Sequence, residues 1–88
     1  MPTLNEERRA LNDEFNLIVG CNIRHHRQRF DMTMKELAEA AGMDITTLLR
    51  VERGERPIKF REAACVARHL GLSIERLAKK QRGIIYEW

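Results

Sequence analysis

Two cysteines and three histidines are the side chains best suited to binding metal or doing catalysis. Cys21 and Cys65 lie far apart, without the close Cys-x-x-Cys pairs of a zinc site. His25 and His26 are neighbours, and neighbouring side chains on a helix point about 100° apart, so they cannot share one tetrahedral ion. The sequence therefore predicts no metal, and it favours both cysteines as small buried hydrophobes.

Catalysis is not indicated either. No Ser/His/Asp, Cys/His or paired-carboxylate set occurs at a spacing that one small helical domain could assemble. We therefore expect the chain to be neither an enzyme nor a cofactor-binding protein.

The basic residues are more informative than these groups. The 88 residues include 16 Lys and Arg against 13 Asp and Glu, a formal net charge of +3. Residues 1–20 are acidic, with two basic and four acidic side chains, whereas residues 50–61 have five basic and two acidic ones. A local basic segment of this kind favours contact with the phosphates of nucleic acid.

Length and composition limit the architecture. A chain of 88 residues, 43% hydrophobic and 33% charged, is typical of one soluble globular domain. No apolar run approaches the roughly 18 residues of a membrane span, and the N-terminus lacks the apolar core of a signal peptide. We expect a cytoplasmic, nucleoid-associated protein with no membrane contact.

Periodicity and capping residues predict an all-α fold. Apolar residues recur at helical spacing in successive stretches, without the alternation of strands. Thr33 and Glu36 form a capping box for a helix over residues 34–41. Gly42 then ends this helix, and Asp44 caps the next one, over residues 45–53. Two helices joined by about three residues have the spacing of a helix-turn-helix.

The remaining boundaries follow from glycine, proline and capping residues. Gly54 ends the third helix, a fourth runs over about 59–70, and a fifth starts at Ser73 and ends by Gly83. Thr3 and Glu6 predict a further helical turn or two over residues 4–11. The expected organisation is an N-terminal extension over residues 1–12, a DNA-binding domain over 13–82 and an apolar tail over 83–88.

The segment from Met32 to Pro57 resembles the helix-turn-helix of the lambda-repressor and Cro-like family, also called the xenobiotic-response-element (XRE) family. Residues 19–27 are similar to its first helix, and residues 66–77 to its fourth and fifth, so the resemblance covers roughly residues 15–80. It implies a compact five-helix bundle that regulates transcription by binding double-stranded operator DNA.

In such proteins the second helix of the motif, here about 45–53, enters the major groove. Ile45, Thr46 and Arg50 are the expected base contacts: Arg50 suits guanine, Thr46 can donate or accept, and Ile45 suits a thymine methyl. Alternatively, this face is a solvated helix surface, or Arg50 pairs with Asp44 or Glu55.

Phosphate contacts are expected from residues around the motif, any one of which could instead be a solvated surface residue. The candidates are Thr33, Lys35, Thr47, Arg53, Arg56 and Lys59, with Asn22 or Arg24 possible on the first helix.

The resemblance also implies one structural ion pair and shows two positions at which this sequence differs from the family pattern. Arg27 and Glu52 occupy positions where the family commonly has a bridge across the core, so we assign them a structural role. His26 stands where an apolar residue is usual and is expected to be a neutral, partly buried core residue. Asp31 stands where glycine is common and must tolerate a left-handed backbone.

We expect a homodimer, because one domain of this size seldom reaches operator-level affinity alone. The candidates for the interface are Leu77, Ile84, Ile85, Tyr86 and Trp88. Two alternatives remain: the tail caps its own core, or it inserts into another protein, as in an antitoxin-like interaction module.

Overall fold

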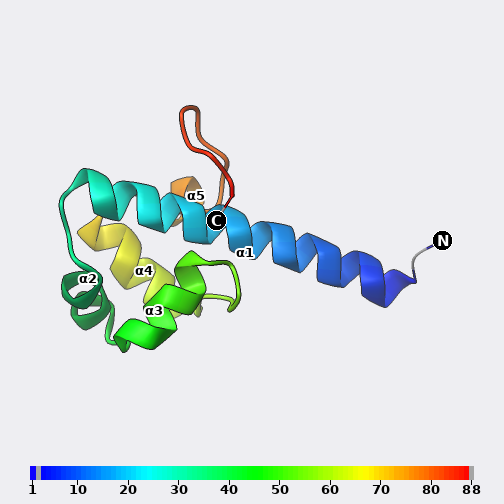
Figure 1. Ribbon diagram of the computed structural model, residues 1–88, viewed down its shortest axis with the longest axis horizontal. Helices are drawn as coiled ribbons and strands as arrows, with labels where there is room; N and C mark the ends of the chain where they lie inside the picture. Colours follow the sequence, from blue (N-terminus) through cyan, green and yellow to red (C-terminus); the bar gives the residue numbers. More distant parts are fainter. Residues whose placement is uncertain (2, 88) are drawn as a thin grey trace.

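The computed structural model describes residues 1 and 3–87, and it confirms the predicted all-α fold. Its helices are α1 (Leu4–Arg29), α2 (Met34–Ala41), α3 (Ile45–Glu52), α4 (Phe60–His69) and α5 (Ile74–Leu77), as Figure 1 shows. None of these helices is long and apolar enough to cross a membrane.

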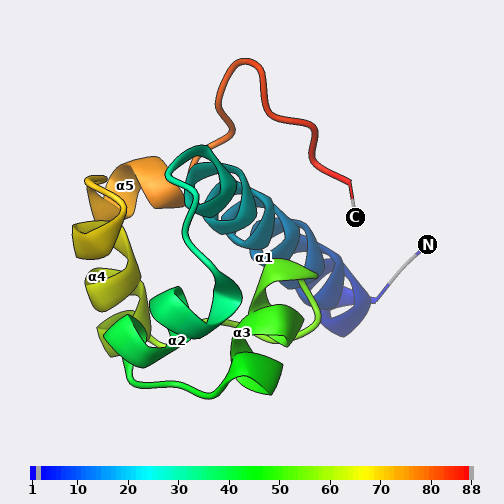
Figure 2. The ribbon, with the colours of Figure 1, turned by 60° about the vertical axis from the view of Figure 1, so that its left-hand side comes forward.

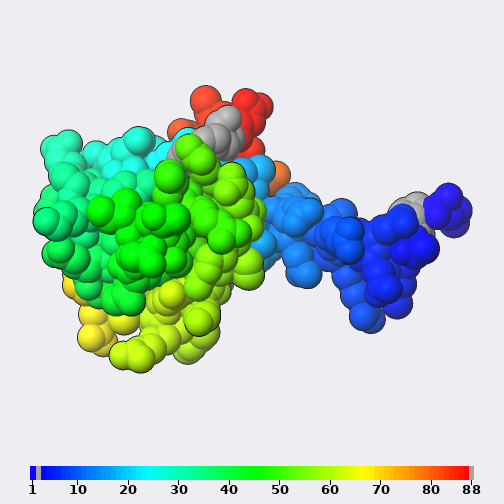
Figure 3. Space-filling model, turned by 60° about the horizontal axis from the view of Figure 1, so that its bottom comes forward, coloured from blue at the N-terminus to red at the C-terminus, as the bar shows by residue number. Residues whose placement is uncertain are grey.

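Helix α1 is much longer than the sequence predicted. Its N-terminus has the expected capping box, in which the Thr3 hydroxyl accepts from the Glu6 N–H. The helix then continues for 26 residues, because no glycine or proline interrupts it before Gly20. The boundary expected near residue 12 thus falls inside a continuous helix. Residues 4–15, which we call the arm, are exposed and stand clear of the body (Figures 1 and 3).

The helix-turn-helix has the predicted boundaries. The Thr33 hydroxyl accepts from the Glu36 N–H, while the Glu36 carboxylate accepts from the Thr33 N–H. Gly42 ends α2 in the left-handed conformation, with φ 69°. Figure 2 shows α2 and α3 side by side, joined by this short turn.

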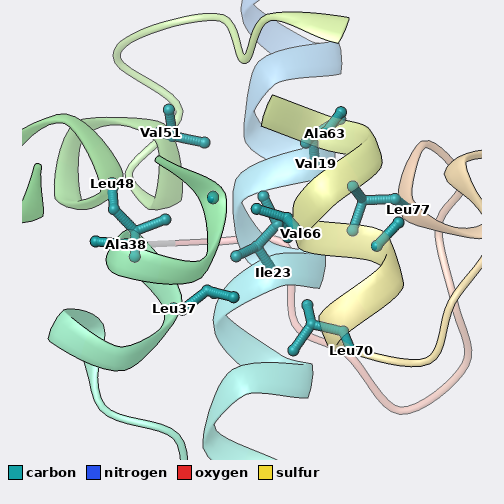
Figure 4. Close-up of a cluster of buried hydrophobic side chains, with 12 residues drawn as sticks. Val19, Ile23, Leu37, Ala38, Leu48, Val51, Ala63, Val66, Leu70 and Leu77 are labelled. Carbon is teal, nitrogen blue, oxygen red and sulfur yellow. The ribbon is translucent and has the colours of Figure 1, made fainter. Parts of the chain in front are cut away.

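The core forms where α1 meets the other helices. Ile23 of α1, Leu37 of α2, Leu48 of α3 and Val66 of α4 are all fully buried. Figure 4 shows Ile23 facing these neighbours at the centre of the cluster. Burying these side chains holds the two short helices of the motif against the long α1.

Gly20 allows the closest approach between α1 and α3. A Cβ atom placed on Gly20 would lie 2.3 Å from the carbonyl oxygen of Val51 and 2.6 Å from that of Glu52. Both atoms belong to backbone, which cannot rotate away as a side chain would. The end of α3 therefore packs directly on the backbone of α1.

The C-terminal tail folds back onto its own α1. The buried Asn22 side chain donates to the carbonyls of Leu77 and Lys79, at 2.8 Å each, and accepts from the Tyr86 hydroxyl at 2.6 Å. The Tyr86 hydroxyl in turn accepts from the Gln81 N–H. Asn22 thus engages one carbonyl at the end of α5 and one just beyond it, and this helix ends at Leu77 rather than extending towards Gly83 as predicted.

These contacts correct part of the expected dimer interface. Leu77 is only 2% exposed and belongs to the core of its own chain, so it has no surface to offer a second copy. Ile84 and Tyr86 are half-buried, and Ile85 remains exposed. Trp88 lies outside the described residues.

Replacing Gly20 with alanine should destabilise the fold by more than replacing Gly42. Gly42→Ala meets no atom within 4 Å and costs only the strain of a positive φ, about 1 kcal/mol. Gly20→Ala must push α3 off α1, and such overpacking costs about 1–3 kcal/mol or more. Urea unfolding of both variants measures the difference, and equal losses would show that the close contact is unimportant.

Candidate nucleic-acid interface

Helix α3 presents a polar face beside a buried one. Leu48 and Val51 are buried as expected, whereas Thr46 and Arg50 are exposed and lie four residues apart on one face. Ile45, at the start of the helix, is 48% exposed. The three predicted base contacts are thus all accessible, Ile45 and Thr46 in the first turn of α3 and Arg50 in its last.

Arg50 does not form the alternative ion pairs. No hydrogen bond or ion pair joins its side chain to any part of the chain that the structure describes. Asp44 instead caps α3, accepting from the Thr47 N–H at 2.7 Å. Hydrogen bonds from the backbone and hydroxyl of Thr47 lower the pKa of Asp44. Thr47 is therefore partly occupied by capping, which weakens its case as a phosphate ligand.

The Arg27–Glu52 pair fixes α3 to α1. Arg27 Nε donates to Glu52 Oε2 at 2.7 Å, and its second terminal nitrogen donates to Oε1 at 3.1 Å. The remaining terminal nitrogen reaches the Met32 carbonyl at 3.0 Å, so the same guanidinium also holds the turn before α2. Glu52 is fully buried, and removing one partner of such a pair costs about 3–5 kcal/mol.

Thr33 and Lys35 lie at the start of α2, and both are exposed. The Thr33 N–H is already taken by the Glu36 carboxylate at 3.1 Å, so a phosphate would have to displace this acid. The Thr33 hydroxyl can still donate its proton, because it only accepts from Glu36. Lys35 carries the positive charge at this end of the surface.

The basic residues after α3 differ from one another. Arg56 is held inside the chain, donating to the Pro57 carbonyl and to Glu62 Oε1, both at 3.1 Å. Glu62 also accepts from the Lys59 N–H at 3.0 Å, so it joins the loop after α3 to the start of α4. Arg53 and Lys59 are both exposed residues.

Glu62 is a residue that the sequence analysis missed. Burial raises its pKa, but hydrogen bonds from Lys59 and Arg56 and their charges outweigh this effect, so the pKa is lowered overall. The spacing of Lys59 and Glu62 matches half of a capping box and could have revealed the contact.

The first helix offers fewer DNA contacts than expected. Asn22 is fully buried and occupied by the tail, so it cannot reach a phosphate. Arg24 donates to the Glu87 carbonyl at 3.0 Å. The prediction of a phosphate contact is therefore wrong for Asn22, whereas for Arg24, which is half-buried, it stays a prediction.

The histidine, aspartate and cysteines that the sequence analysis singled out are explained by packing and backbone conformation. His26 is 5% exposed, with its Nε2 2.9 Å from Gln81 Oε1. Asp31 adopts the left-handed backbone expected of it, with φ 54°. Cys21 is buried, which raises the pKa of its thiol, but Cys65 is only half-buried. Among the described residues, no three His, Cys, Asp or Glu side chains gather to hold a metal ion.

Comparison with known proteins identifies the fold around this surface. A family model described as helix-turn-helix matches residues 23–80, about two thirds of the chain. The chain belongs to the lambda-repressor-like helix-turn-helix family. Among curated protein sequences, none is significantly similar to it.

Two solved structures share this helix-turn-helix fold. The clp gene regulator ClgR from Corynebacterium glutamicum is 28% identical, with a TM-score of 0.69 over 72% of this chain and 67% of that one. The restriction-modification controller protein C.AhdI from Aeromonas hydrophila is 24% identical, with a TM-score of 0.66 over 70% of this chain and 94% of that one. The second likeness shows the fold alone.

Acid should weaken the Glu62 contacts. A carboxylate with a lowered pKa stabilises the folded state above its ordinary value, here 4.5, and loses this contribution as the pH falls through the lowered pKa. Glu62→Gln should therefore flatten the decline in unfolding free energy below about pH 4.5. Urea unfolding between pH 3 and 7 measures this, with Glu55→Gln in the exposed loop as the control. An unchanged decline in Glu62→Gln would remove Glu62 as an anchor.

Proposed function

We propose that the chain is a DNA-binding transcription regulator that binds operator DNA as a homodimer, with α3 in the major groove. The observation that carries this proposal is the accessible side chain of Arg50, which extends from a helix that Arg27 and Glu52 lock to the core. A guanidinium without an intramolecular partner loses no ion pair when it binds a base. Membership of the helix-turn-helix family supports the same placement of α3.

Base recognition would use three neighbouring side chains of α3. Arg50 can donate two hydrogen bonds to guanine O6 and N7, and Thr46 can bond either a donor or an acceptor on a base edge. Ile45 can contact a thymine methyl. Ile45 and Thr46 lie in the first turn of α3, the end that reaches deepest into the groove in such motifs, while Arg50 lies one turn further along the helix.

Phosphate contacts would come from both ends of the motif. Lys35 and the Thr33 hydroxyl lie at the start of α2, while Arg53 and Lys59 follow α3. Arg56 is a weaker candidate, because Glu62 already neutralises it. These contacts would orient the domain and supply the salt-dependent part of the affinity without reading sequence.

The contacts of the tail weaken the antitoxin-like alternative. Tyr86 is bound to Asn22 and Gln81 of its own chain, so insertion into another protein would first have to break these hydrogen bonds. ClgR is a gene regulator, which supports a regulatory rather than an enzymatic role. Such a protein would act in the cytoplasm, where the DNA lies.

Arg50→Ala should reduce affinity for the best operator by about 1–3 kcal/mol and relax preference at one base pair, because one bidentate contact is lost. Selection of bound sequences from random DNA defines that operator, and titration of single-base variants measures the preference. Leu49→Ala, on the half-buried side of α3, is a control for the helix itself. An equal loss on every sequence would assign Arg50 to phosphate instead.

Lys35→Ala should weaken binding to all DNA sequences alike and reduce the slope of log affinity against log salt by about one contact. The measurement is a titration at several salt concentrations. Lys79→Ala is the matched control, because Lys79 lies just after α5 and its ammonium is paired with Glu75 of that helix. A slope that falls equally in both variants would indicate a general charge effect rather than contact at α2.

A further inference from the structure

The arm presents an apolar stripe that no other part of the described residues covers. Leu4, Leu11 and Phe15 are 60%, 65% and 49% exposed. Their spacing of seven and four residues places them along one face of α1, and Val19 continues that face into the body. An exposed helix of about 12 residues has only marginal stability in water. Burying this stripe against another surface would stabilise the arm.

The stripe leads into an apolar groove at the base of the arm. The groove has a volume of about 210 Å³ and is lined by Phe15 and Val19 of α1, Ile58 and Phe60 at the start of α4, and Ile74 of α5. Phe60 is 77% exposed, although it is large and aromatic. Figure 3 shows the arm projecting from the body beside the start of α4.

We propose that the arm of one copy lies in the groove of a second copy, so that two antiparallel α1 helices form the homodimer interface. This inference rests on the homodimer of the proposed function and replaces the tail as its interface. A single chain carries both halves, stripe and groove, on the same side of α1. A twofold axis can therefore satisfy both contacts at once, with none left open for further copies.

The register agrees with this pairing. When the twofold axis passes between Leu11 and Phe15, Leu11 of each copy faces Phe15 of the other. Residues 4–8 then lie opposite residues 18–22, of which Val19 lines the groove.

Area and charge favour a second copy over other occupants. Covering Leu4, Leu11, Phe15, Phe60 and Ile74 removes on the order of 500 Å² from each copy, or about 1,000 Å² in total, where specific interfaces begin. The arm has an excess of two negative charges, which opposes binding to DNA. Lys59 is exposed and directly precedes Phe60 of the groove, so a positive charge is available to an acidic arm that binds there.

Sedimentation without DNA tests the interface. The wild-type chain should be dimeric at micromolar concentration, and Leu11→Asp and Phe60→Lys should each be folded monomers, since both side chains are exposed. Ile85→Asp, an equivalent change at an exposed tail residue, is the control and should stay dimeric. Circular dichroism establishes that each variant remains helical.

A mixture of the two monomeric variants provides the sharper result. One Leu11→Asp chain and one Phe60→Lys chain retain one native arm-to-groove contact and set the introduced carboxylate against the introduced ammonium in the other. We therefore expect the mixture to form dimers although neither variant does so alone. A mixture that stays monomeric overturns the proposed pairing.

Other outcomes separate this inference from the proposed function. A dimer lost in Ile85→Asp but kept in Leu11→Asp overturns the arm-to-groove interface and leaves the proposed function intact. A wild-type chain that is monomeric overturns the interface and the proposed homodimer, but not DNA binding by the single domain. A dimer that depends on Leu11 and Phe60 but binds no specific DNA supports the interface and refutes the regulator.

Discussion

The ion pair between Arg27 and Glu52 is the contact on which the proposed DNA-reading surface depends. Helix α3 has only eight residues, too few to be stable alone, and its position is set by what its buried side touches. Glu52 stands at its last turn, fully buried, with both carboxylate oxygens bonded to one guanidinium. The third nitrogen of Arg27 holds the Met32 carbonyl, so one side chain positions both α3 and the entry to α2.

This ion pair works together with the absence of a side chain at Gly20. The carbonyls at the end of α3 approach the α1 backbone so closely that no Cβ fits between them. Shape therefore brings the helices together, and the ion pair selects one rotation and register, because two hydrogen bonds to a planar guanidinium tolerate little displacement. The opposite face of α3 makes no contacts with the core, so Arg50 is accessible for the proposed contact with DNA.

Local signals predicted the motif well because its boundaries are set locally. The capping box of Thr33 and Glu36, the left-handed Gly42 and the cap of Asp44 all act within four residues, so a reader of the sequence can find them. The Arg27–Glu52 bridge was predicted only through the family resemblance. The early end of α5 was missed, since it depends on Asn22, 55 residues away from Leu77. Composition alone gives no sign that an asparagine in α1 binds the tail.

The tail and the arm show why apolar residues near chain ends are ambiguous in sequence. Ile84, Ile85 and Tyr86 were expected at a dimer interface, as exposed apolar residues would be. A single buried polar group changes that expectation: once Asn22 is buried in α1 it needs partners, and the Tyr86 hydroxyl provides one. The tail thereby supplies hydrogen-bond partners to a buried side chain of its own domain. The arm contains no buried polar side chain of this kind, and its leucines and phenylalanine stay exposed along one face of the helix. The apolar surface that a second copy could cover is therefore at the N-terminus of the chain rather than at its C-terminus.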